Sequence, residues 1–134
     1  MFLAKLSNEK RHLFLDLELH ISKIDGEFSE SEKNIIDTHC IEMHIDSNKY
    51  QCELSLDEVI RKLSECTVQE KHIIFIEMLA VVMADEVYHE KEKQIVEDLA
   101  DVLGISNDEI IKAFSALNKL KEAYEELSNF VYGV

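Results

Sequence analysis

The chain has 134 residues, of which 46% are hydrophobic, and this is the size of one domain that can bury a continuous core. It carries 28 acidic and 14 basic residues, and the resulting charge of -14 repels nucleic acids and anionic lipid surfaces. Proline is absent and glycine occurs only three times, so the composition predicts an all-α protein. The longest apolar stretch, residues 73–84, is interrupted by Glu77 and is too short to cross a bilayer. Because the first residues also lack a signal-peptide layout, we expect a cytoplasmic protein.

Helix starts are predicted from capping boxes, in which Ser or Thr is followed three residues later by Glu. Four of them occur: Ser29/Glu32, Ser55/Glu58, Thr67/Glu70 and Ser106/Glu109. The first helix is expected from Ser7 to the turn at Asp25, and a second covers residues 30–45. A polar connection then leads to a short helix after Ser55.

The second half begins with a helix after Thr67 that is apolar nearly all round, and we expect it to be the central helix. An amphipathic helix follows His89 and ends at Gly104, where a left-handed residue commonly closes a helix. After Ser106, apolar residues recur at alternating spacings of four and three, with a break expected near Ser115. This last region is expected to pack as a closing helix or helix pair.

The two halves of the chain resemble each other. Sliding the chain along itself until Asp25 falls on Asp85 also superposes Glu30 on Glu90, Glu32 on Glu92 and Lys33 on Lys93. We therefore predict one domain over residues 1–134, with two repeated three-helix units at about 8–66 and 67–132. The predicted fold is a helical bundle of about six or seven helices.

Each half has an acidic corner between two helices, residues 25–32 and 85–92. If the corners meet, four carboxylates converge, and such close like charges repel unless a cation or protons intervene. The predicted metal ligands are Asp25, Glu32, Asp85 and Glu92. Oxygen ligands of this kind suit Ca²⁺ or Mg²⁺ better than zinc or copper. The structural alternative is that the carboxylates only cap helices, because Asp-Gly forms turns and acidic residues favour a helix N-terminus.

Other metal sites fit less well. An EF-hand loop would need ligands at Ile21 and Lys23, and at Val81 and Met83 in the second half, so a self-contained calcium loop is excluded in both halves. The di-iron signature requires two Glu-x-x-His motifs, and only Glu86 to His89 is present. A zinc cluster of His39, Cys40 and His44 would lack a second ligand pair.

The runs Asp25 to Lys33 and Ala84 to Lys93, with the continuation Ala100 to Ser106, resemble the tellurite-resistance TerB-like family. The resemblance covers residues 13–120. It implies a compact helical bundle in the bacterial cytoplasm, linked to metal or stress responses, and it assigns the repeated acidic residues to the same four positions. The chain departs from the family at Glu86, where a glycine is common, and in the long polar connection around Cys52.

Two functions follow. The first is an acidic domain that binds a divalent ion between its corners and has a regulatory or stress-related role. The alternative is a metal-free interaction module whose acidic face docks a protein partner with a basic surface. We expect no enzyme, because the sequence contains no nucleophile with a matching base and no phosphate-binding loop.

Overall fold

The structure is a computed structural model that describes residues 1–24, 30–83 and 90–133. These residues form six α-helices and one short 3₁₀ helix, with no strand among them, which confirms the predicted all-α class. The chain divides into two compact units, Met1–Gly104 and Ile105–Val134. No described helix combines the length and the apolar character needed to cross a membrane.

The helices follow the order expected from the sequence. The first unit contains η1 (Leu3–Lys5), α1 (Asn8–Ile24), α2 (Glu30–Met43), α3 (Leu56–Ser64), α4 (Val68–Val82) and α5 (Glu90–Leu103). The second unit contains α6 (Asn107–Tyr132). Helices α2 and α5 are equally long, with 14 residues each, and they begin at Glu30 and Glu90, which the sequence repeat superposes.

The predicted caps explain where most helices begin. Ser55, Thr67 and Ser106 each accept a hydrogen bond from the N–H three residues later, and the Thr67 and Ser106 boxes are reciprocal. Ser7 Oγ accepts from the N–H of Lys10 at 3.3 Å. Gly104 has φ 69°, as expected for the residue that closes α5. Ser29, the remaining predicted cap, lies outside the described residues.

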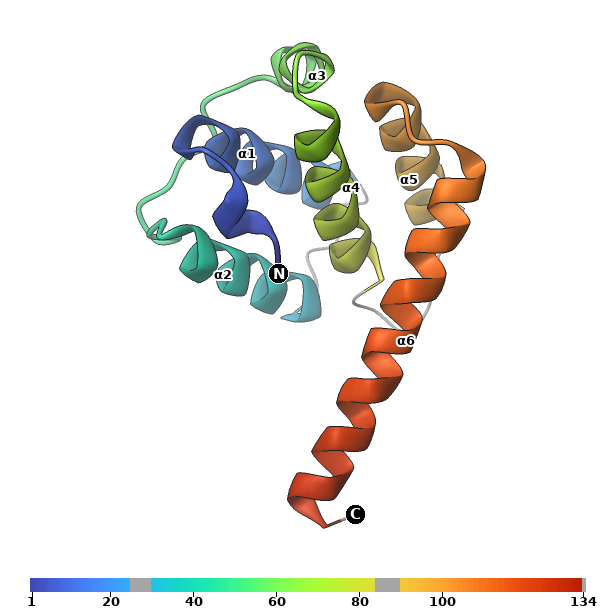
Figure 1. The fold of residues 1–134 in the computed structure, drawn as a ribbon. Helices are drawn as coiled ribbons and strands as arrows, with labels where there is room; N and C mark the ends of the chain where they lie inside the picture. The colour runs from blue at the N-terminus through green and yellow to red at the C-terminus, as the bar shows by residue number, and fades with distance from the viewer. Residues whose placement is uncertain (25–29, 84–89, 134) are drawn as a thin grey trace. The chain divides into compact units, whose positions relative to one another are not determined.

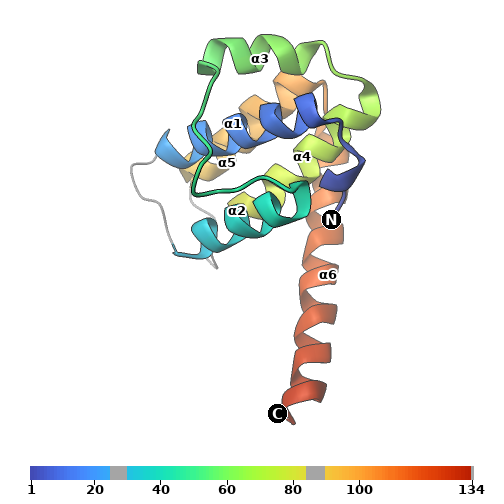
Figure 2. The same ribbon diagram turned by 90° about the vertical axis from the view of Figure 1, so that its left-hand side faces the viewer.

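Helix α4 is the central helix of the first unit, as predicted. It contacts α5, α2 and η1, while α1 contacts α2 and α3, and α3 also contacts α5. The view in Figure 1 places α4 between the α1/α2 pair and α5, and Figure 2 shows α3 lying along α1. Most of α4 is buried, because neighbours cover it on several sides: Ile73, Ile74, Phe75, Glu77, Met78, Leu79, Val81 and Val82.

Two elements differ from the expectation. In α1, burial extends beyond the apolar stripe to Asp16 and Glu18, which are 1% and 0% exposed. Helix α6 is continuous through Ser115, where a break was expected. None of its residues is buried.

Truncation of Ile74 tests the central position of α4. Ile74 is fully buried, so Ile74→Ala removes buried methyl groups and leaves a cavity, and we expect a loss of about 2–5 kcal/mol in the free energy of unfolding. Urea unfolding monitored by circular dichroism measures this loss. The matched control is Ile41→Ala on α2, where the side chain is 75% exposed and the change should stay within about 0.5 kcal/mol. Equal losses at both positions would contradict the described core.

Candidate functional site

The structure describes two of the four predicted metal ligands. Glu32 lies in the first turn of α2 and Glu92 in the first turn of α5, and both side chains are buried. Asp25 and Asp85 lie outside the described residues, together with Glu86 and His89 of the single Glu-x-x-His motif. The convergence of the two corners therefore stays a prediction.

The burial of Glu32 and Glu92 separates them from ordinary capping glutamates. All of the helices α2 to α6 have Glu as their third residue. At this position of α3 and α6, Glu58 and Glu109 are exposed, and Glu70 of α4 is half-buried. Glu32 and Glu92 are only 9% and 7% exposed. Helix capping accounts for a Glu at this position, but it does not require that the carboxylate be buried.

The described residues hold no complete metal site. Among residues 1–24, 30–83 and 90–133, no three His, Cys, Asp or Glu side chains lie together so that they could bind an ion. This includes the His39, Cys40 and His44 pattern. Burial raises the pKa of Cys40 to about 11, and the carboxylates of Glu18 and Asp37 add to the effect, so its thiol stays protonated at neutral pH. A metal at the corners would need the carboxylates of Asp25 and Asp85.

A buried ionic cluster that the sequence analysis missed connects three helices of the first unit. His39 of α2 lies between two buried carboxylates, with its Nδ1 at 3.0 Å from Glu18 Oε2 of α1. Its Nε2 lies 3.3 Å from Glu77 Oε2 of α4. Two carboxyl groups facing the two ring nitrogens favour a ring that carries a proton on each nitrogen, which is the charged imidazolium.

The electrostatics of this cluster agree with its geometry. Burial alone would lower the pKa of His39, but the hydrogen bonds to Glu18 and Glu77 outweigh it and raise the pKa to about 9. Burial alone would raise the pKa of Glu77, whereas hydrogen bonds from His39, the Phe2 N–H and the Met1 amino group lower it to about 2. Burial raises the pKa of Glu18, and the interaction with His39 opposes that rise. The charged ring of His39 and the ionised carboxylate of Glu77 therefore coexist over the pH range between about 2 and about 9.

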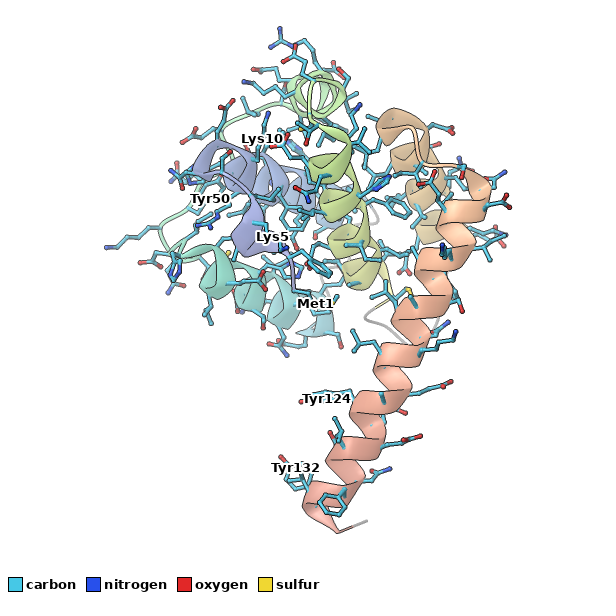
Figure 3. The ribbon with its side chains drawn as sticks, in the orientation of Figure 1. Met1, Lys5, Lys10, Tyr50, Tyr124 and Tyr132 are labelled. Carbon is cyan, nitrogen blue, oxygen red and sulfur yellow. The ribbon has the colours of Figure 1, made fainter. Side chains whose placement is uncertain are left out.

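The first residues of the chain complete the cluster. The Phe2 N–H donates to Glu77 Oε1 at 2.7 Å, and the Met1 amino group lies 3.0 Å from the same oxygen. The amino group also lies 2.8 Å from Glu42 Oε1 of α2. Met1 is labelled in Figure 3, on the segment that leads into η1. Because η1 contacts α2 and α4, these bonds hold the chain start against the helices that carry Glu42 and Glu77.

Another buried carboxylate, that of Asp16 on α1, fixes the polar connection between α2 and α3. Asp16 of α1 accepts from Tyr50 Oη at 2.5 Å and from the Leu54 N–H at 3.1 Å. His20, also on α1, bonds through Nε2 to the Leu54 carbonyl at 2.7 Å. Tyr50 is labelled beside α1 in Figure 3. The connection is thus held by α1 at both Tyr50 and Leu54.

Cys52 lies within this connection, with its Sγ 3.3 Å from His20 Nε2. A cysteine next to a histidine is a possible nucleophile, but this pair lacks the required activation. The Nε2 must donate to the Leu54 carbonyl and so cannot accept the thiol proton. Burial and the neighbouring Asp16 carboxylate raise the pKa of Cys52, which favours the protonated thiol.

The ionic cluster makes stability depend on pH. Because the pKa of His39 is higher in the folded chain than the value of about 6.5 in an unfolded one, its stabilisation is full below pH 6.5 and is lost as pH rises through about 9. The free energy of unfolding should therefore fall in this range by at most about 1.4 kcal/mol per pH unit. The pKa of Glu77 is lower in the folded chain than its ordinary value of 4.5. Its ionised carboxylate therefore contributes its full stabilisation of the fold above pH 4.5, and this contribution is lost as pH falls toward 2.

Urea unfolding of the native chain and His39→Gln between pH 6 and 10 measures the first effect. We expect His39→Gln to cost about 3–5 kcal/mol at pH 7, because it leaves buried carboxylates without a counter-charge, and to remove much of the alkaline slope. The control is His44→Asn, since His44 is exposed with φ 59° and Asn tolerates this conformation. An unchanged slope in His39→Gln would contradict the assignment of a charged ring.

Comparison with known proteins agrees with the helical fold. The family described as tellurite resistance protein TerB matches residues 46–115, from the polar connection to the first part of α6. The match includes Asp85 and Glu92 of the second corner, while the first corner precedes it. No curated protein and no solved structure gives a significant match. Because the family match covers more than half of the chain, this protein belongs to the TerB family.

Proposed function

We propose that this TerB-family protein binds a divalent cation at its two acidic corners and that binding serves a regulatory or stress-response role in the bacterial cytoplasm. The observation that carries the proposal is the burial of Glu32 and Glu92, which occupy equivalent positions in α2 and α5. The third-position glutamates of α3, α4 and α6 are more exposed. Each acidic corner thus has a buried glutamate, and helix capping alone does not require this burial.

The chemistry of the ligands supports a hard cation. A buried carboxylate requires a cation, a proton or hydrogen-bond donors to offset its lost hydration. Four carboxylate groups, from Glu32, Glu92, Asp25 and Asp85, would provide oxygen ligands to Ca²⁺ or Mg²⁺. The charge of -14 would also raise the local concentration of cations near the protein. A bound cation would join α2 to α5 and so couple the two repeated halves.

Thermal unfolding after chelation tests the proposal with Ca²⁺, Mg²⁺ and Mn²⁺ added singly. Mass action predicts about 2.7 kcal/mol of stabilisation when the free ion is at 100 times its Kd. For a domain of this size, 1 kcal/mol raises Tm by about 2–8 °C. We expect the rise in the native chain and not in the double variant Glu32→Gln, Glu92→Gln, nor in Asp25→Asn, Asp85→Asn.

The matched control is Glu58→Gln, Glu109→Gln, which alters the same helix position and the same charge at exposed sites. This variant should keep the response to the ion. If no ion raises Tm in the native chain, or if the control loses the response as fully as the corner variants, metal binding at the corners is wrong. The acidic face would then fit a metal-free contact with a basic protein partner.

A further inference from the structure

The second unit presents an apolar stripe along the length of α6. Seven apolar side chains recur without interruption at alternating spacings of three and four: Ile110, Ala113, Leu117, Leu120, Tyr124, Leu127 and Val131. This is the a and d pattern of a coiled coil over about three heptads. At 1.5 Å per residue, the 26 residues of α6 give a helix about 39 Å long.

The C-terminal part of the stripe is exposed. No residue of α6 is buried, and the large apolar side chains from Leu120 onward are between 50% exposed (Leu120) and 87% exposed (Phe130). Tyr124 and Tyr132 project from the same side of the helix in Figure 3. These residues follow the family match, which ends at residue 115. An exposed apolar patch of this density usually marks an interaction surface.

The charge of α6 favours contact between two copies of it. The helix has five acidic residues and three lysines, so its charge is -2, and the rest of the chain carries -12 of the total of -14. Two copies of the chain therefore repel each other least when they meet through α6. A heptad stripe is also self-complementary, because the same side chains provide knobs and holes on both helices.

The order of the charges selects the direction of pairing. Lys119 and Lys121 precede Glu125 and Glu126 along α6. With the stripe at positions a and d, Lys121 and Glu125 lie on one edge of it (e and b), and Lys119 and Glu126 on the other (both c). A parallel pair would place lysine beside lysine and glutamate beside glutamate. An antiparallel pair centred between Leu120 and Tyr124 places Lys121 near Glu125 of the second copy, and Lys119 near its Glu126.

We propose that α6 pairs with α6 of a second copy of this chain as an antiparallel coiled coil that buries Leu120, Tyr124, Leu127 and Val131. This proposal does not rest on metal binding at the corners. Each first unit is joined to the N-terminal end of its own α6, so the two points of attachment would lie at opposite ends of the antiparallel helix pair.

Sedimentation velocity of the full chain, from low to high micromolar concentration, tests the dimer. We expect a species with twice the 15.5 kDa mass of the chain, and its loss in Leu127→Asp, which puts a charge into the stripe. The control is Asn129→Asp, which adds the same charge on the opposite face (position f) and should stay dimeric. Circular dichroism checks that both variants remain helical. A native chain that stays monomeric at every concentration, or a Leu127→Asp variant that dimerises like the native chain, overturns the proposal.

Charge reversal tests the antiparallel direction. Lys121→Glu and Glu125→Lys each place like charges across the proposed pair, so each variant alone should dimerise more weakly than the native chain. An equimolar mixture of the two should recover dimer, because each glutamate then faces a lysine of the other chain. A parallel pair predicts the reverse, with tighter dimers for either variant alone, and that result overturns the antiparallel arrangement.

Discussion

The contacts of His39 bring together parts of the first unit that are far apart in the sequence. Both ring nitrogens bond to other helices, one to Glu18 on α1 and one to Glu77 on α4. Glu77 in turn receives the N–H of Phe2, so the chain start depends on the same carboxylate. A buried ion pair stabilises little relative to apolar packing, but the loss of one partner leaves an uncompensated charge. Arrangements of these helices that separate the three groups are therefore strongly disfavoured.

The cluster also relates the core to the candidate metal site. Glu32, Ile36, His39 and Met43 are buried at helical spacing on α2, so one face of the helix carries both the corner carboxylate and the cluster. The equivalent face of α5 carries Glu92, Val96, Leu99 and Leu103. The repeat that superposes Glu32 on Glu92 also superposes His39 on Leu99, so the second half has an apolar side chain where the first has a charged ring. The acidic position repeats in both halves, whereas the histidine of the ionic cluster occurs only in the first and bridges to Glu77 in the second.

Most helix limits could be predicted from the sequence, because caps such as Thr67/Glu70 and the closing Gly104 act through residues three or four positions apart. Burial of Glu18 could not, since its partner His39 is 21 residues away and belongs to another helix. Glu77 was recognisable in the sequence as an acidic residue within an apolar helix. Its partners could not be predicted, because they lie in other segments of the chain. For the candidate site, the Ser29/Glu32 capping box and the sequence repeat placed Glu32 and Glu92 in first turns, but their burial depends on tertiary packing. The continuity of α6 through Ser115 was not predicted, because the residues around Ser115 have only weak preferences for or against a helix.

The hydrogen bonds of Asp16 divide the connection between α2 and α3 into two parts with different tolerance to change. From Tyr50 to Leu54 the chain is tied to α1 through the Tyr50 hydroxyl and the Leu54 N–H, so its length and course are constrained. Residues 46–49 form an exposed turn whose hydrogen bonds are local, with Asp46 accepting from Asn48, Lys49 and Tyr50. Exposed turns of this kind tolerate insertions. A fluorescent or affinity peptide placed between Ser47 and Asn48 would therefore report on the protein while leaving both acidic corners, the core and α6 unaltered.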